Sequence, residues 1–342
     1  MDTPSGGWYT WGSMKRARAL RSFSHALMLF RDYAMKRPVC SRPPFRIWLD
    51  LSTACNLRCR ICPQSLRKLP PRHMAFDLFE KIIDEVRDYV FDVNLAVTGE
   101  SLLNPRLPEM IRCAARRGVI TRLHTNATML TGELSREIIE AGLSFISFSL
   151  DGFDKAGYEA VRTGATWEET VRNIREFLAV KARLGSRTPY AVVKTIVNPD
   201  DYRRDRAAAF EALFEGMPVN RFRINPMHNF GGKMTEVPFS RLARTVCYVA
   251  WYGLTVLADG AIVPCCMDFW NDYPLGDANN ERIIDAWNGA RMVALRRALI
   301  EGRGDEVALC RGCYFTYAQK RLRKQHLKDA FAFLKEYRTI TR

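Results

Sequence analysis

Apolar and polar positions along the middle of the chain follow two alternating periods. Short apolar runs, typical of buried strands, are separated by longer segments in which apolar residues recur every three or four positions, as in amphipathic helices. The predicted strands span 45–51, 93–98, 119–124, 144–150, 190–197 and 220–225, and the predicted helices span 75–90, 105–117, 133–141, 154–161, 166–184 and 201–215. Thr166 and Glu169 have the spacing of a capping box at the start of the fifth helix.

This alternation predicts βαβ units around a parallel sheet. Six such units are more than an open sheet needs and fewer than the eight of a closed TIM barrel, so we expect a partial α/β barrel. Ligands of parallel α/β folds bind at the carboxyl ends of the strands. We therefore expect the residues of a functional site in the segments that follow the predicted strands.

The two ends of the chain have patterns of their own. Residues 14–36 predict a helix whose apolar face is formed by Leu20, Phe23, Leu27, Phe30 and Ala34, and this face either packs on its own domain or lies at a membrane interface. After about residue 240, two apolar runs joined by Asp259-Gly260 predict a β-hairpin. A helix is predicted over 279–300, and a basic helix over 316–338.

The composition is that of a globular protein of 342 residues, enough for about two domains, with 47% hydrophobic and 26% charged residues. No apolar run reaches the roughly 18 residues of a membrane span, and the first residues do not resemble a signal peptide. We therefore expect a cytoplasmic protein. Its ten cysteines favour metal or redox chemistry, because a chain with a large core does not need disulfides as cross-links.

The formal charge of +15 is concentrated at the two ends of the chain. Residues 1–45 carry eight Lys or Arg and two acids, and residues 303–342 carry ten and four, so each end has a net charge of +6. Residues 46–302 have a net charge of only +3, which argues against a core that binds nucleic acid. The basic ends suit an acidic partner or the surface of an anionic membrane, with simple solvation as the alternative.

Three cysteines, Cys55, Cys59 and Cys62, follow the first predicted strand in the stretch DLSTACNLRCRICP. Thiolates are soft ligands that suit zinc or the iron of an iron–sulfur cluster. A structural zinc site normally takes four protein ligands, and this segment offers three. A 4Fe–4S cluster held by three cysteines leaves one iron open, so the vacancy would be for a substrate or cofactor.

The spacing Cys-x3-Cys-x2-Cys after the first strand resembles the signature of the radical S-adenosylmethionine (SAM) enzymes. The resemblance implies a partial (β/α)6 barrel as the core and a 4Fe–4S cluster whose open iron is chelated by SAM. An electron from a donor such as flavodoxin or ferredoxin then cleaves SAM to a 5′-deoxyadenosyl radical, which abstracts a hydrogen atom from the substrate.

The same resemblance assigns the residues that would contact SAM. Gly99 and Glu100 in VTGESLLNP match a motif that holds its amino group. Ser149 in ISFSLDG would hydrogen-bond the ribose, and Arg162 in YEAVRTG would bind the carboxylate. Asn126 in HTNATML would fix a turn beside the cofactor.

A second set of cysteines, Cys247, Cys265, Cys310 and Cys313, resembles the SPASM/twitch extension of these enzymes. Four thiolates imply one auxiliary 4Fe–4S cluster used for electron transfer, with a structural zinc site as the alternative. Cys266 adjoins this set and could exchange with its neighbour as ligand, pack, or donate a hydrogen atom to a substrate radical. The implied division of the chain is 1–44, the radical SAM core 45–239, the auxiliary domain 240–315, and 316–342.

Three functions remain open from the sequence. The first is oxidation or epimerisation of a small metabolite, such as a sugar or a nucleotide- or lipid-linked compound. The second is maturation of a peptide or protein, as in sulfatase or ribosomal-peptide modification. The third, from a different class, is a non-catalytic iron–sulfur electron carrier or scaffold.

Overall fold

The computed structural model describes residues 22–197, 203–227, 229–234 and 244–317. The helix predicted at 316–338 lies almost entirely outside these residues, as does the stretch 14–21 of the predicted N-terminal helix.

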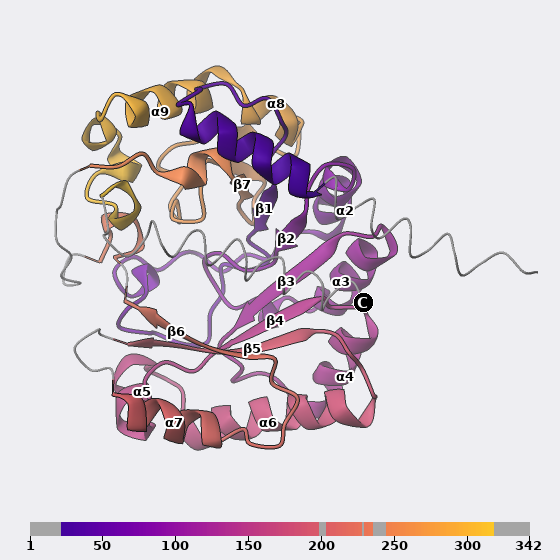
Figure 1. The fold of residues 1–342 in the computed structure, drawn as a ribbon. Helices are drawn as coiled ribbons and strands as arrows, with labels where there is room; N and C mark the ends of the chain where they lie inside the picture. Colours follow the sequence, from indigo (N-terminus) through magenta and orange to yellow (C-terminus); the bar gives the residue numbers. More distant parts are fainter. Residues whose placement is uncertain (1–21, 198–202, 228, 235–243, 318–342) are drawn as a thin grey trace, which may run out of the picture.

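Six strands form a parallel sheet in the order in which they occur in the chain. They are β1 (Arg46–Leu49), β2 (Asp92–Asn94), β3 (Ile120–Thr125), β4 (Phe145–Ser149), β5 (Tyr190–Val197) and β6 (Arg221–Pro226). The helices between them are α2 (Phe76–Val86), α3 (Leu107–Arg116), α4 (Gly132–Glu140), α5 (Lys155–Val161), α6 (Trp167–Arg183) and α7 (Arg204–Ala212). Figure 1 shows the strands fanning out with these helices on their outer side, which confirms the predicted open, partial barrel.

The two faces of this sheet differ in character. The rings of Phe148 and of Phe177 in α6 pack edge to face, with centroids 5.2 Å apart, and Phe222 makes a similar contact with Phe210 of α7 at 6.3 Å. These positions therefore face the helices. Their neighbours along the strands point to the opposite face, because side chains alternate along a strand. We call this opposite face the inner face of the barrel.

Two local predictions differ from the structure. The capping box at α6 is not formed: Thr166 Oγ1 donates to Glu169 Oε2 at 3.4 Å, and no side chain caps the backbone there. Strand β2 is shorter than its apolar run, because the side chain of Asn94 accepts the N–H of Ala96 at 3.2 Å and the chain turns away into the site.

The predicted hairpin is present and extends the same sheet. Strand β7 (Gly253–Val256) pairs in parallel with β1, and β8 (Ala261–Val263) and β9 (Gly276–Asp277) follow antiparallel, which gives nine strands. The helix predicted over 279–300 is interrupted at Asn288 and Gly289, so it forms α8 (Ile283–Trp287) and α9 (Ala290–Ile300). The division of the chain at 240 stays a prediction, and the two parts share one sheet.

An N-terminal helix at 22–34, drawn in indigo in Figure 1, lies against the part of the chain that carries α8 and α9. It is held by Tyr33, whose hydroxyl donates to the carbonyl of Val246 at 2.9 Å, and by buried Leu29. Buried Asp32 accepts the N–H of Ser41 at 2.6 Å. This bond fixes the rotation of the helix about its own axis.

The apolar stripe that would pack this helix on its own domain is exposed instead. Phe23, Leu27 and Phe30 retain 53%, 54% and 62% of their accessible surface. The side of the helix that packs is the neighbouring one, which carries the buried residues Leu29 and Asp32, because their contacts decide which face is turned inward. No helix within the described ranges is long and apolar enough to cross a membrane.

Candidate active site

The segment that carries the first three cysteines, residues 52–65, is called the cluster loop below. It begins just past β1 and is anchored to the end of α5, because the N–H groups of Arg58 and Arg60 donate to the carbonyls of Thr163 and Val161, both at 2.9 Å. Gln64, near the end of this loop, donates from Nε2 to the carbonyl of Thr53 at the start of the loop and to that of Thr98 after β2, both at 2.9 Å. The backbone that positions the three thiols is thus tied to two separate elements.

The three thiols of the cluster loop share one electrostatic environment. Burial raises the pKa of each, that of Cys62 to about 11, and the charges of the other two cysteines raise the pKa of Cys62 further. The positive charge of Arg162 acts in the opposite direction on all three. Three wholly or partly buried thiols near one cation, with no fourth ligand on the loop, fit a 4Fe–4S cluster, whose iron would favour the thiolate form.

Arg162 connects the cluster loop to the end of β4. Its Nε donates to Oδ2 of Asp151 at 2.8 Å, and its Nη1 lies 3.7 Å from the sulfur of Cys59. Asp151 is fully buried and also accepts the N–H of Ile196 at 2.9 Å. Arg162 is therefore an interior cation held between a carboxylate and a thiol.

Gly99 and Glu100 lie directly against the cluster loop. A Cβ on Gly99 would overlap the carbonyl oxygens of Ser52 and Ala54, so only glycine fits there. The N–H of Glu100 donates to the carbonyl of Ala54 at 2.9 Å, and its carboxylate accepts the N–H of Asn126 at 2.7 Å.

Asn126 joins the loop from the end of β3, since its Nδ2 donates to Oδ1 of Asn56 at 3.1 Å. The next residue, Ala127, has a φ of +62°, a left-handed conformation that glycine adopts more readily. Ser149 ends β4 and is nearly buried on the inner face, at the same edge of the sheet. Gly99, Glu100, Asn126 and Arg162 thus contact the cluster loop, and Ser149 lies at the same edge of the sheet.

Sequence reasoning missed the buried pair of Asp50 and Thr98. Thr98 donates to Asp50 from its hydroxyl at 2.6 Å and from its N–H at 3.1 Å, and burial raises the pKa of Asp50 to about 7. The pair links the ends of β1 and β2 beneath the cluster loop. An acid inside the apolar run FRIWLDL was the available signal, because a carboxylate is rarely buried without a partner.

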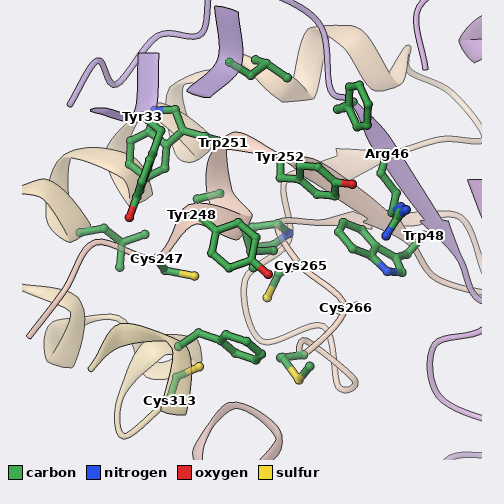
Figure 2. A pocket seen from close by; sticks show the side chains of 18 of the residues that line it. Tyr33, Arg46, Trp48, Cys247, Tyr248, Trp251, Tyr252, Cys265, Cys266 and Cys313 are labelled. Atoms are coloured by element: carbon green, nitrogen blue, oxygen red, sulfur yellow. The ribbon is translucent and has the colours of Figure 1, made fainter. Parts of the chain in front are cut away.

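The second cysteine set surrounds one end of a cavity of about 480 Å³. Figure 2 shows the sulfur atoms of Cys247, Cys265 and Cys313 turned toward a common space near Tyr248. Cys310 also lines the cavity, and the N–H of Cys313 donates to its carbonyl at 3.1 Å. Burial raises the pKa of all four thiols. Positively charged iron would stabilise their thiolate form, as proposed for the cluster loop.

Cys266 lines the same cavity beside this set. Burial raises the pKa of its thiol to about 12, with Arg46 as the neighbouring cation that lowers it. In the part of the chain that the structure describes, no three His, Cys, Asp or Glu side chains lie so that they could hold one single metal ion; the cysteines of a 4Fe–4S cluster each bind a different iron. All ten cysteines are free of disulfides.

Comparison with known proteins identifies the family. Residues 49–213 match the model of the radical SAM superfamily, and residues 247–314 match that of SPASM, an iron–sulfur cluster-binding domain. The chain belongs to the radical SAM superfamily and carries a SPASM domain. Its cofactors are a 4Fe–4S cluster that binds SAM, an auxiliary 4Fe–4S cluster and SAM itself, and it is a radical SAM enzyme.

Two curated relatives match most of the chain. The tungsten-containing aldehyde ferredoxin oxidoreductase cofactor-modifying protein of Pyrococcus furiosus is 26% identical in an alignment of 295 residues that covers 73% of this chain and 82% of that protein. The mycofactocin maturase MftC of Mycobacterium ulcerans is 24% identical over 265 residues, 77% of this chain and 67% of that protein.

A solved structure, Streptococcus suis SuiB bound to the precursor peptide SuiA, superposes with a TM-score of 0.62. The match covers 79% of this chain and 70% of SuiB at 11% identity, so it supports the fold alone.

Proposed function

We propose that this radical SAM enzyme oxidises or epimerises a small metabolite bound between the inner face of the barrel and the auxiliary cysteines. The observation that carries the proposal is the cavity of about 480 Å³, which runs from Arg46, Trp48 and Arg122 to the second cysteine set. Small-molecule sites have volumes of about 300–1,000 Å³. The auxiliary cluster would take part of this space, which leaves room for a compact substrate.

In this proposal Cys55, Cys59 and Cys62 hold the SAM-binding cluster, which supplies the electron for SAM cleavage after reduction by flavodoxin or ferredoxin. Glu100 binds the amino group of SAM. Two backbone N–H groups and the Thr125 side chain already bond to its carboxylate, but a carboxylate offers about four acceptor positions. Arg162 faces the SAM carboxylate, to which a guanidinium is complementary.

Ser149 is the proposed partner of the SAM ribose, while Gly99 and Asn126 shape the backbone around the cofactor. Cys247, Cys265, Cys310 and Cys313 hold the auxiliary cluster. Cys265 is favoured over Cys266 as ligand, because the charges of both Cys310 and Cys313 act on its thiol, whereas of these two only the charge of Cys313 acts on the thiol of Cys266. Cys266 remains a candidate hydrogen donor, and unchanged substrate turnover in Cys266→Ser with both clusters intact would reject that role.

The test of catalysis is anaerobic reconstitution with iron and sulfide, followed by addition of dithionite and SAM. We expect 5′-deoxyadenosine to form and to require both the reductant and the reconstituted protein. The measurement is quantification of 5′-deoxyadenosine by liquid chromatography and mass spectrometry. Clusters that assemble fully without any SAM cleavage would instead support an electron carrier or scaffold.

A peptide substrate is the second candidate. The two relatives are named a cofactor-modifying protein and a maturase, so each modifies another molecule. Among the described strands, β6 pairs only with β5 and is an edge of the sheet, where an extended peptide could be added. Transfer of deuterium into 5′-deoxyadenosine from a deuterated metabolite extract, but not from a deuterated peptide extract, would exclude this candidate.

We also propose that the N-terminal helix binds an anionic membrane surface. Its exposed stripe of Phe23, Leu27 and Phe30 could insert among lipids, and residues 1–45 carry a net charge of +6. An amphipathic helix with basic flanks combines these two attractions at a membrane interface.

The double variant Phe23→Ser/Phe30→Ser is expected to bind vesicles that contain phosphatidylglycerol at least about tenfold more weakly, because each buried phenylalanine contributes about 1.5–3 kcal/mol. Flotation of the full chain with anionic and with neutral vesicles provides the measurement. Leu184→Ser, at an exposed leucine after α6, is the matched control. Equal flotation with both lipid compositions, or none with either, would contradict the proposal.

A further inference from the structure

Two cations lie directly opposite each other on neighbouring strands of the inner face. Lys194 on β5 is in register with Ser149 on β4 and with Arg223 on β6. Phe148 and Phe222 point to the helices, so Ser149 and Arg223, one residue further along, point to the inner face. Like charges directly opposite each other in a sheet are destabilising, which makes this pairing unfavourable without a compensating charge.

No carboxylate of the described residues forms an ion pair with Lys194. Within those ranges no hydrogen bond or ion pair reaches its ammonium group, although the side chain is half-buried. Asp151 is the acid whose charge acts on Lys194, but its oxygens already accept from Arg162 at 2.8 Å and from the N–H of Ile196 at 2.9 Å. A desolvated cation without an adjacent anion carries a free-energy penalty that a bound anion would remove.

The surroundings add further positive charge. Arg46 and Arg122 share one carboxylate, that of Asp92, at 2.6 Å and 3.8 Å respectively. The imidazole of His124 is also in this region. Burial lowers its pKa well below the usual value, and four positive charges lower it further, those of Lys194, Arg122, Arg46 and Arg223. A neutral imidazole adds no charge but can still donate one hydrogen bond.

Four arginines of this region line the cavity of the proposed active site. Arg46, Arg122, Arg221 and Arg223 all line it, and Figure 2 shows Arg46 beside the indole of Trp48. Lys194 is level with Ser149, the proposed contact of the SAM ribose. An anion bound between Lys194 and Arg223 would therefore lie between the SAM site and the rest of the cavity.

We propose that Lys194 and Arg223 form an anion subsite that binds a phosphate or carboxylate group of the substrate. The inference rests on the proposed function, since it names the substrate class of that same cavity. An oxyanion there would give Lys194 an ion-pair partner and accept hydrogen bonds from both side chains. The substrate is thus an anionic metabolite, held by its charged group with the rest of the molecule in the cavity.

The test uses the reconstituted full chain, saturated with SAM, at constant ionic strength. Isothermal titration calorimetry with inorganic phosphate and with succinate separates the two oxyanion chemistries. We expect saturable binding of at least one of them, weakened at least about tenfold in Lys194→Met and in Arg223→Gln, because hydrogen bonds between ionised groups are stronger than those between neutral groups. Lys194→Arg keeps the charge and should keep most of the affinity.

Lys155→Met, at an exposed lysine of α5 far along the sequence from either residue, is the matched control and should bind as the wild type does. Circular dichroism of each variant establishes that it is folded. Absence of saturable binding in the wild type, or equal binding in all folded variants, would overturn the subsite. A loss of SAM affinity in Lys194→Met with unchanged anion binding would also overturn it and assign Lys194 to SAM.

Cleavage of SAM is measured on the same samples. Normal 5′-deoxyadenosine formation without anion binding would reject the subsite and leave the enzyme activity intact. Anion binding without SAM cleavage would instead count against the proposed reaction.

Discussion

Cys59→Ala is expected to reduce reductive cleavage of SAM by more than about a hundredfold. Loss of a residue that only supports a metal ligand typically lowers metal affinity or activity by 10–100-fold, so loss of a ligand itself should have a larger effect. Cys59 is buried, and its sulfur lies 3.7 Å from Nη1 of Arg162. Its removal would therefore take away one of three proposed ligands and the thiol that faces this cation.

The measurements are the yield of 5′-deoxyadenosine under anaerobic conditions with dithionite and the electron paramagnetic resonance signal of the reduced protein. Cys113→Ser is the matched control, because Cys113 is a buried cysteine of α3 whose sulfur contacts Arg117 at 3.0 Å, outside the cluster loop. The control should retain both the signal and the cleavage. Wild-type cleavage by Cys59→Ala would remove the cluster loop from the mechanism.

Arg162→Met is expected to destabilise the protein by about 3–5 kcal/mol, because it leaves the buried carboxylate of Asp151 without its cation. For a chain of this size that corresponds to a fall in melting temperature of roughly 5–10 °C. Anaerobic thermal denaturation followed by circular dichroism measures the change. SAM cleavage by the same variant should also fall, since the proposed carboxylate contact is lost.

A double variant separates the two effects. Arg162→Met/Asp151→Asn removes both charges, so most of the melting temperature should return while SAM cleavage stays low. The exposed pair of Lys155 and Glu168, with a distance of 2.9 Å, is the matched control, and Lys155→Met should leave the melting temperature nearly unchanged. A melting temperature for Arg162→Met equal to that of the wild type would show that Asp151 does not depend on this cation.

The strand and helix pattern of the core was predictable because it follows from local periodicity. The predicted strand 190–197 coincides with β5, and the predicted helix 154–161 differs from α5 by one residue. The predictions were wrong at positions where a competing local contact decided the structure. Asn288 and Gly289 interrupt the helix predicted over 279–300, and Thr166 bonds to the Glu169 side chain rather than to the backbone.

The N-terminal helix shows the limit of an apolar stripe as evidence. Periodicity identified Phe23, Leu27 and Phe30 as one face, and they do share a face, but that face is exposed. Which side of a helix packs depends on contacts with distant residues, here the bond from Tyr33 to Val246 and the burial of Asp32. Such contacts leave no trace in the spacing of the apolar residues.

The sequence by itself determined the order of strands and helices, the two sets of cysteines and their placement after a strand and around a hairpin. Those features depend on neighbours within a few positions, which local spacing reports directly. Only the tertiary structure decided that Arg162 lies between Asp151 and Cys59. It also decided that Thr98 donates a hydrogen bond to Asp50 and that Lys194 is in register with Arg223. These contacts depend on strand register and on the packing of segments that are far apart in the chain. No local pattern of apolar and polar residues encodes either.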